Sequence, residues 1–207
     1  MLQRDTTDRL GALQAIGCAD RRLETLPAWV DFLVADAETL ALIEPQEADR
    51  LIALRPHLKE LAAKLSDYRL PSTLVHGDLH PGNIAAQHGE YLFYDWTDAC
   101  IAHPFMDLIT VLEETDTLPD QTLATARLRH AYLSQWTDFE PQDRLVEAWS
   151  LAEPLAALHQ VISYRNIYGI LEVGTKMEFA RGLKYWVQKL LSIAANQSTQ
   201  RRPNPNN

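Results

Sequence analysis

The chain lacks the features that mark several large protein classes. It has only two cysteines, Cys18 and Cys100, which lie far apart and form no CxxC pair; this is typical of reduced thiols in a cytoplasmic protein. No uncharged apolar run approaches the roughly 18–20 residues that a membrane span requires. The first residues also lack the apolar core of a signal peptide. A cytoplasmic location is therefore expected.

Positive charge is also scarce. The chain has 19 Lys and Arg against 28 Asp and Glu, which gives a formal net charge of −9. Binding to nucleic acid requires a positive face for the phosphates, so no nucleic-acid partner is expected. Hydrophobic residues make up 46% and charged residues 23% of the 207 positions. This composition is ordinary for a globular protein, and the length suffices for one domain with a real core, or for two small ones.

The first part of the chain is patterned for helices. A long helix is expected over residues 47–66, because leucines recur along one face at helical spacing: Leu51, Leu54, Leu58, Leu61 and Leu65. Pro56 lies inside this stretch and is expected to kink or split the helix. An earlier helix begins near Pro27, and its apolar face continues to Leu40.

After Pro71 the pattern changes to short strands. Residues 72–75 predict one strand, and residues 83–87 and 90–94 predict a hairpin that turns at His88-Gly89. Further helices are expected over residues 105–114, 120–135, 142–168 and 175–195, followed by a frayed polar tail over residues 196–207. The expected fold class is α+β, mainly α, with so little β structure that the hairpin must lie on the helical body.

One segment points to a particular chemistry: His76-Gly77-Asp78-Leu79-His80-Pro81-Gly82-Asn83, followed by Tyr94-Asp95-Trp96. Asp78 lies in mid-loop, where a carboxylate can accept the proton of a substrate hydroxyl. Asn83 and Asp95 flank the hairpin, which brings their oxygen atoms together as ligands for Mg²⁺, a cation that uses few protein groups. Phosphoryl transfer needs this combination of positioning and charge cancellation.

Three motifs in order, H-G-D-L-H-P-G-N, Y-D-W-T-D-A and H-P-F-M-D-L, resemble the aminoglycoside phosphotransferase and choline kinase group of small-molecule kinases. The resemblance covers residues 71–108 in detail and the helical remainder more loosely. It implies a protein-kinase-like fold, ATP as co-substrate, Mg²⁺ as cofactor and a hydroxyl group of a small molecule as acceptor. No membrane partner is implied.

The same resemblance assigns roles to individual residues. Asp78 matches the catalytic aspartate. Asn83 and Asp95 match the metal ligands, and through the metal they bind the nucleotide. Three further side chains would support the loop: His76, His80 and Asp107. For Asp107, at the start of the next helix, the support would come from accepting backbone N–H groups.

The resemblance does not extend to the lobe that covers ATP in kinases of this fold. That lobe is mostly antiparallel sheet and supplies a lysine, whereas residues 1–70 contain no glycine-rich strand–turn–strand and no strand lysine. We therefore expect residues 1–195 to form the C-terminal lobe alone, with leading helices in 1–70, the catalytic loop and metal-binding hairpin in 71–103 and a helical subdomain in 104–195. The face left without its lobe would favour self-association.

Two other functions remain open. The chain can be a non-catalytic binding or interaction module that keeps the fold without the reaction. Alternatively, His76, Asp78 and His80 form an H-x-D-x-H pattern that a metal-dependent hydrolase can use for Zn²⁺ or a pair of metal ions. Asn83 suits the kinase pattern better, and the hydrolase alternative predicts a transition metal that stays bound through purification.

Overall fold

The computed structural model describes residues 2–113, 120–172 and 174–200. Most of them are helical, and the strands form two small sheets, so the predicted mainly helical α+β class is confirmed. The helices are α1 Leu2–Asp5, α2 Leu10–Ala15, α3 Leu26–Ala35, α4 Ala37–Leu40, α5 Pro45–Leu65, α6 Leu108–Glu113, α7 Gln121–Leu133, α8 Gln142–Ile170 and α9 Lys176–Gln200. The strands are β1 Ala19–Asp20, β2 Thr73–Val75, β3 Ile84–Gln87, β4 Glu90–Phe93 and β5 Cys100–Ala102.

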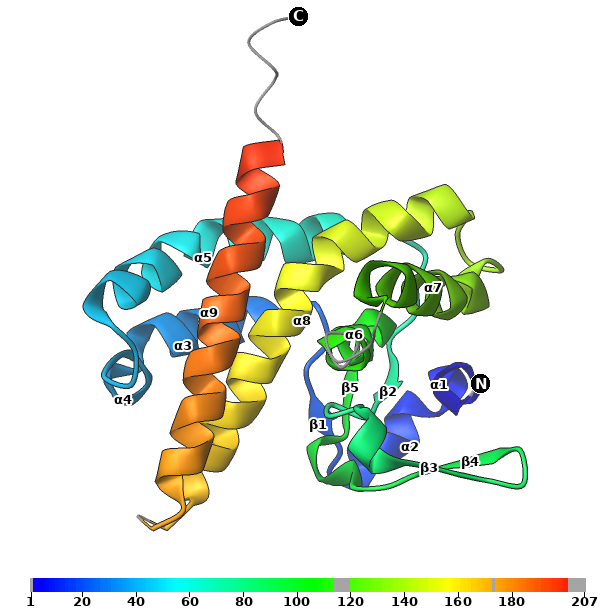
Figure 1. The fold of residues 1–207 in the computed structure, drawn as a ribbon, viewed down its shortest axis with the longest axis horizontal. Helices are drawn as coiled ribbons and strands as arrows, with labels where there is room; N and C mark the ends of the chain where they lie inside the picture. The colour runs from blue at the N-terminus through cyan, green and yellow to red at the C-terminus, as the bar shows by residue number, and fades with distance from the viewer. Residues whose placement is uncertain (1, 114–119, 173, 201–207) are drawn as a thin grey trace, which may run out of the picture.

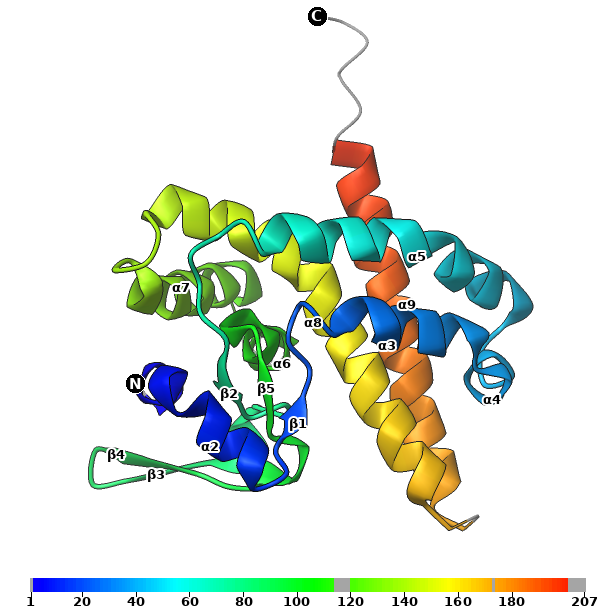
Figure 2. The same cartoon turned by 180° about the vertical axis from the view of Figure 1, so that it is seen from behind.

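Helix α8 is the centre of the molecule. Figure 1 shows α9 running antiparallel beside it, with α3 and α5 on one flank and the strands on the other. The reverse view in Figure 2 brings α3 and α5 to the front, where they cross the α8–α9 pair. Between Leu155 and Ser163 the side chains of α8 are buried without interruption, because the helix packs against neighbours on all sides.

The long leucine-rich helix forms as predicted. α5 begins with Pro45 in its first turn, and a reciprocal capping box joins the side chains and backbones of Glu44 and Glu47. The leucines of the predicted stripe are buried or partly buried in the main core. Pro56 does not split the helix: α5 runs continuously from Pro45 to Leu65, and Pro56 lies on its exposed face.

The preceding helix is shorter than predicted. The apolar face was expected to continue from Pro27 to Leu40, but α3 ends at Ala35 and Asp36 adopts an extended conformation. The Asp36 carboxylate accepts a hydrogen bond from the backbone N–H of Thr39 at 3.1 Å, which caps the separate helix α4. It also pairs with the guanidinium of Arg165 on α8, with a second contact from Arg165 Nη2 to Asp36 Oδ1 at 3.2 Å. The helix therefore ends at Ala35, and the Asp36–Arg165 ion pair connects this segment to the central helix α8.

The Asp36–Arg165 ion pair predicts a pH-dependent contribution to stability. The Arg165 guanidinium lowers the pKa of Asp36 from 3.8 to about 2. Because the folded-state pKa lies below the unfolded value, the stabilisation is present above about pH 4 and is lost as the pH falls towards 2. Asp36→Asn should therefore lower the free energy of unfolding by about 2 kcal/mol at pH 7, and by about half as much at pH 3. Asparagine keeps the helix cap, so the difference reports the charge.

Urea unfolding at the two pH values measures this effect. Asp31→Asn is the matched control, because Asp31 also pairs with two cations, Arg55 and Lys59, but on an exposed surface. Its loss should be clearly smaller. A loss for Asp36→Asn that does not change between pH 7 and pH 3 would contradict the ion-pair account.

The larger sheet contains two strands that the sequence pattern did not predict. Its order is β1-β5-β2, with β5 parallel to β1 and antiparallel to β2. The predicted strand at residues 72–75 is confirmed as β2, whereas β1 and β5 have two and three residues and are too short for periodicity to reveal. Ile101 at the centre of β5 is fully buried. This sheet fixes the base of the loop that follows β2.

The predicted hairpin is confirmed as β3 and β4, and His88 and Gly89 take the positive φ values of a tight turn, 52° and 83°. The expectation that it lies on the helical body is wrong. Figure 1 shows it extending past α1 and α2, away from the large helices α8 and α9, and Tyr91 and Leu92 are 69% and 58% exposed. Only its base is held, where the Tyr94 N–H donates to the Asn83 carbonyl at 2.9 Å.

The later helices begin and end within a few residues of their predicted bounds, except at the C-terminus. The tail was expected to fray from Asn196, but α9 continues to Gln200. The reason is that polar side chains there bond back to helices: the Ser198 hydroxyl donates to Ala194 O at 2.9 Å, and the Gln197 amide donates to Ser150 O of α8 at 2.7 Å. Residues 201–207 and Glu114 lie outside the described residues. No described helix is both long and apolar enough to cross a membrane.

Candidate active site

The loop after β2 turns on a glycine that no other residue can replace without strain. Gly77 has a φ of 85°, in the left-handed region that favours glycine. A Cβ atom at Gly77 would lie 2.3 Å from the carbonyl oxygen of Asp98. The loop therefore approaches the segment after β4 at backbone contact, and this close approach brings the two halves of the sequence motif together.

Asp107 is the buried acceptor that holds the start of this loop. It lies in the 3₁₀ turn Pro104–Asp107 just before α6. Its Oδ1 accepts from the Gly77 N–H at 2.8 Å, and its Oδ2 accepts from the His76 N–H at 2.9 Å and from the side-chain amide of Gln3 at 3.0 Å. Burial raises the pKa of Asp107, and the two backbone N–H groups oppose that rise. The site thus has a rigid support below the loop.

Asp78 follows in the part of the loop that reaches the surface. Its side chain is half-buried, and burial raises its pKa, a shift that His80 opposes and that the nearby carboxylate of Asp98 reinforces. The Asp78 N–H donates to Nδ1 of His76 at 3.4 Å, and Nε2 of His80 lies 3.7 Å from Oδ2 of Asp78. A carboxylate with a raised pKa beside solvent is suited to accept a proton.

Asn83 joins the end of the loop to its middle. Its side-chain NH₂ donates to the backbone carbonyl of Asp78 at 3.0 Å. Its own carbonyl accepts from the Tyr94 N–H, so the residue before Asp95 is held directly against Asn83. The hairpin therefore returns the chain to the loop, as the sequence predicts. The amide oxygen of Asn83 is the atom that can ligate a cation.

Asp95 has a backbone conformation that sets it apart from its neighbours. With φ 55° and ψ 67° it is in the left-handed region, where a residue with a Cβ atom is uncommon. The Thr97 hydroxyl donates to Asp95 Oδ1 at 2.6 Å, and this hydrogen bond lowers the pKa of Asp95. The carboxylate is thus held ionised next to Tyr94 and the loop, in the state that a metal ligand needs.

The two histidines of the loop make local contacts. His76 is buried, its Nε2 lies 2.6 Å from the carbonyl oxygen of Tyr94, and its ring packs on Trp96 with 4.6 Å between centroids. His80 accepts the Gly82 N–H at 3.1 Å through Nδ1 and so caps the start of the 3₁₀ turn Pro81–Asn83. Both histidines shape the backbone around Asp78.

Hydrogen bonds thus link Asn83 to the backbone of Asp78 on one side and to Tyr94, the residue before Asp95, on the other. Among the described residues, no group of three or more His, Cys, Asp and Glu side chains is arranged to hold a metal ion. Mg²⁺ needs only one or two protein groups when phosphate oxygens complete its shell, so Asn83 and Asp95 fit such a cation. A zinc site requires three or four protein ligands, which these residues do not offer.

Sequence reasoning missed several residues that contact the site. Asp98 lies beside Asp78 and Gly77, and two side chains of α8, Gln160 and Ser163, contact the same segments. Only Asp98 carried a signal, because it stands in the Y-D-W-T-D-A motif. Gln160 and Ser163 lie 83 and 65 residues beyond their partners, Gly77 and Asp98, and only the fold brings them there.

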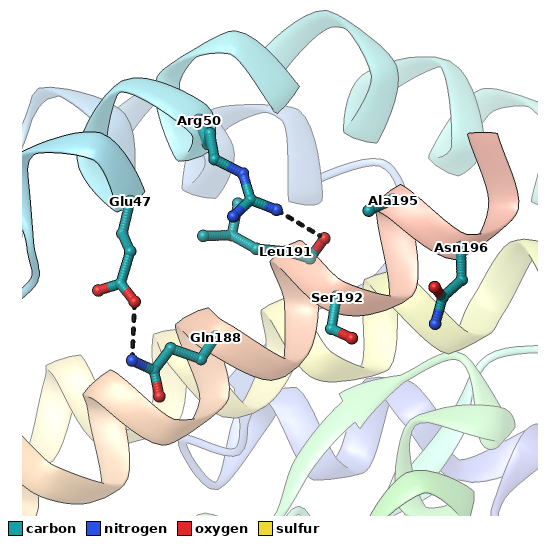
Figure 3. Close-up of a pocket in the computed structure, with 7 residues that line it drawn as sticks. All are labelled: Glu47, Arg50, Gln188, Leu191, Ser192, Ala195 and Asn196. Atoms are coloured by element: carbon teal, nitrogen blue, oxygen red, sulfur yellow. Dashed lines mark hydrogen bonds between the residues drawn. The ribbon is translucent and has the colours of Figure 1, made fainter. Parts of the chain in front are cut away.

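The surface grooves elsewhere have a simpler explanation. Figure 3 shows one of about 310 Å³ between α5 and α9, where Glu47 accepts from Gln188 at 2.7 Å and Arg50 donates to Leu191 O at 3.3 Å. These contacts join two packed helices, and the groove lies away from the loop. An apolar cavity of about 350 Å³ lies next to the loop instead, lined in part by Leu79, Phe93 and Trp96.

The comparison with protein families defines the class. The model of the phosphotransferase enzyme family matches residues 4–144, which include the loop, the hairpin and Asp107. The chain belongs to this family, and the resemblance read from its motifs is confirmed.

Solved structures of a glucosamine kinase are also similar to the chain. Two crystal forms match 92% of it at 20% and 19% identity, with TM-scores of 0.45 and 0.44. A third, in complex with glucosamine, ADP and inorganic phosphate, has a TM-score of 0.38. The chain spans about half the length of these proteins, 50% to 51%. No curated protein matches the chain.

Proposed function

We propose that the protein transfers the γ-phosphoryl group of ATP to a hydroxyl group of a small molecule, with Mg²⁺ as cofactor. The observation that carries the proposal is the contact chain from Asp78 through Asn83 to the segment of Asp95. In-line phosphoryl transfer requires a proton acceptor beside oxygen ligands for the metal, and this contact chain supports such an arrangement. Membership of the phosphotransferase family supports the same reaction class.

Each residue has one role in this proposal. Asp78 orients the acceptor hydroxyl and takes its proton as the new bond forms. Asn83 and Asp95 would hold Mg²⁺, which when bound neutralises charge on the phosphates of the nucleotide. His76, His80 and Asp107 keep the loop in the shape that aims Asp78.

We further propose that residues 1–195 correspond to the C-terminal lobe of a kinase-like protein, divided at residues 70 and 103 as the sequence indicates. The cytoplasm is its proposed location. In this arrangement a nucleotide-covering lobe would meet the exposed hairpin and the mouth of the loop. Its contribution to positioning is large in general, since orientation alone supplies about 7–11 kcal/mol. The described residues contain no such lobe, and by themselves they are proposed to bind Mg²⁺-nucleotide more readily than they catalyse phosphoryl transfer.

Calorimetric titration of the protein with ATP, with and without Mg²⁺, tests the proposal. We expect binding that requires Mg²⁺ and that weakens at least about tenfold in Asp95→Ala, because one of two protein ligands is lost. Asp49→Asn, on an exposed turn of α5, is the control and should bind as the wild type does. Equal affinity with and without Mg²⁺ would remove the metal-ligand role of Asp95.

The exposed hairpin favours a second candidate, a binding module that associates with a second copy of itself. Tyr91, Leu92 and Tyr94 are exposed next to the apolar cavity at Phe93. Of the described strands, only β3 pairs with β4, so the outer edge of β4 presents alternating donors and acceptors. An antiparallel edge of this kind is complementary to a copy of itself about a two-fold axis.

Light scattering over a range of concentrations tests this candidate. We expect the mass to rise from 23.5 kDa towards twice that value. Leu92→Glu should keep the protein monomeric, because it places a charge among the exposed apolar side chains of β4. Leu128→Glu on α7, away from the hairpin, should leave the association unchanged. A mass that stays at the monomer value in the wild type would contradict self-association.

A further inference from the structure

One turn of α8 contacts both segments of the candidate site. The side-chain amide of Gln160 donates to the carbonyl oxygen of Gly77 at 2.6 Å. One helical turn further, the Ser163 hydroxyl donates to Oδ1 of Asp98 at 3.1 Å. Gln160 and Ser163 are both 99% buried. The catalytic loop and the segment that follows Asp95 are therefore fastened to the same rigid helix.

Ser163 also connects Asp98 to a buried cation. Nη1 of Arg21, the residue after β1, donates to the Ser163 hydroxyl oxygen at 2.8 Å. Arg21 is 93% buried, and its Nε has no hydrogen-bond partner within the described part of the chain. A buried guanidinium is costly unless negative charge compensates it, and the Ser163 hydroxyl links it to the carboxylate of Asp98. The chain Arg21–Ser163–Asp98 is thus a hydrogen-bonded relay between opposite charges.

His159 completes the environment of Arg21. Its Nε2 lies 3.4 Å from Nη1 of Arg21 and 3.8 Å from Sγ of Cys100 on β5. Burial and the neighbouring arginine lower the pKa of His159 well below its usual value, so the ring is neutral and Nε2 can accept a hydrogen bond. The turn from His159 to Ser163 therefore reaches β5, the catalytic loop and the segment after Asp95.

We propose that the turn 159–163 of α8, together with Arg21, is a positioning clamp that sets the distance between the loop carrying Asp78 and the segment carrying Asp95. Gln160 fixes the loop at Gly77, and the Arg21–Ser163 pair fixes Asp98, whose backbone packs against Gly77. The effect of the clamp on catalysis rests on the proposed function, because the spacing of Asp78 and Asp95 matters only for that reaction. The mechanical clamp does not depend on any activity.

The matched pair Ser163→Val and Ser163→Thr tests the clamp. Valine and threonine have nearly the same shape, and each adds a methyl group to the Cβ atom of serine. Valine also replaces the hydroxyl with a second methyl group, so only threonine keeps the hydroxyl that links Arg21 to Asp98. The measurement is native-state hydrogen exchange of two backbone amides, Gly77, which donates to Asp107, and Ala99, which donates to Trp96 O. Amides in the interior of α5 report global unfolding.

In Ser163→Val we expect exchange at Gly77 and Ala99 to accelerate at least about tenfold, with the α5 amides within about threefold of wild type. Ser163→Thr should stay close to wild type throughout. Gln160→Met, which keeps the length of the side chain but not the donor, provides a second variant and should accelerate exchange at Gly77. Equal behaviour of valine and threonine variants, or a uniform acceleration that includes α5, would overturn the clamp.

Titration with Mg²⁺-ATP separates this proposal from the proposed function. If the wild type binds, Ser163→Val should weaken binding at least about tenfold, because the proposed metal ligands Asn83 and Asp95 lose their spacing. Ser163→Thr keeps the hydroxyl and should bind as the wild type does. If the wild type does not bind but the exchange pattern holds, the clamp stands and the phosphotransferase proposal for this chain fails. Unchanged binding in Ser163→Val would overturn the positioning role.

Discussion

Asp78→Asn is expected to reduce phosphoryl transfer by about 10²–10⁴-fold, the contribution usual for a positioned general base. Asparagine has nearly the same shape and keeps the loop contacts, since the Asn83 amide bonds the backbone carbonyl at position 78 rather than its side chain. What is lost is the ability to accept a proton. Affinity for Mg²⁺-ATP should therefore change by no more than about twofold, because the metal ligands are intact.

The measurement is ATP-dependent phosphorylation of hydroxyl-bearing small molecules. It uses the chain together with a nucleotide-covering lobe, the form for which turnover is proposed. Asp49→Asn is the control for loss of one surface charge. The reaction needs ionised Asp78, and burial raises its pKa above 3.8, so the rate should fall as the pH drops through that raised pKa. Turnover by Asp78→Asn at the wild-type rate would remove Asp78 from the mechanism.

Asp107→Ala is expected to cause the largest loss of stability of any single change at the site, about 3 kcal/mol or more. The carboxylate accepts from the N–H groups of His76 and Gly77 and from the Gln3 amide, and all of these are buried around it. Alanine would leave the donors unsatisfied, at about 1–3 kcal/mol each, and this exceeds what is regained by not burying a charge.

Asp107→Asn serves as the matched control, because it keeps one acceptor oxygen and the same volume. Its loss in free energy of unfolding should be measurably smaller than that of alanine in urea titrations at pH 7. Stability of Asp107→Ala within about 0.5 kcal/mol of wild type would show that the loop does not depend on this acceptor.

The elements that the sequence predicted well are those with long periodic patterns or a turn signal. α5 was visible from its leucine stripe, and the hairpin from His88-Gly89 between two apolar runs. The failures have physical causes. Asp36 ends α3 because Arg165, more than a hundred residues away, pairs with it. The short β1 is a strand because β5 pairs with it, and β5 is a strand because it pairs with both β1 and β2.

The candidate site divides in the same way. Asp78, Asn83, Asp95 and Asp107 stand in one stretch of about thirty residues, so their motif could be read directly. The α8 side chains that hold this stretch lie far along the chain on a helix whose pattern shows only burial. Arg21 follows a strand of two residues. Nothing in local sequence distinguishes a buried glutamine that bonds Gly77 from one that packs elsewhere.

The most direct test of the account replaces Mg²⁺ with Mn²⁺, whose unpaired electrons broaden nearby nuclear magnetic resonance signals. With Mn²⁺-ATP added, we expect the signals of the Asn83 side-chain amide and the Asp95 backbone amide to disappear first. The Gln188 side-chain amide, in the groove between α5 and α9, should stay sharp. Broadening centred on that groove, or none at Asn83 and Asp95 while ATP is bound, would contradict the assignment of the metal and nucleotide to this loop and hairpin.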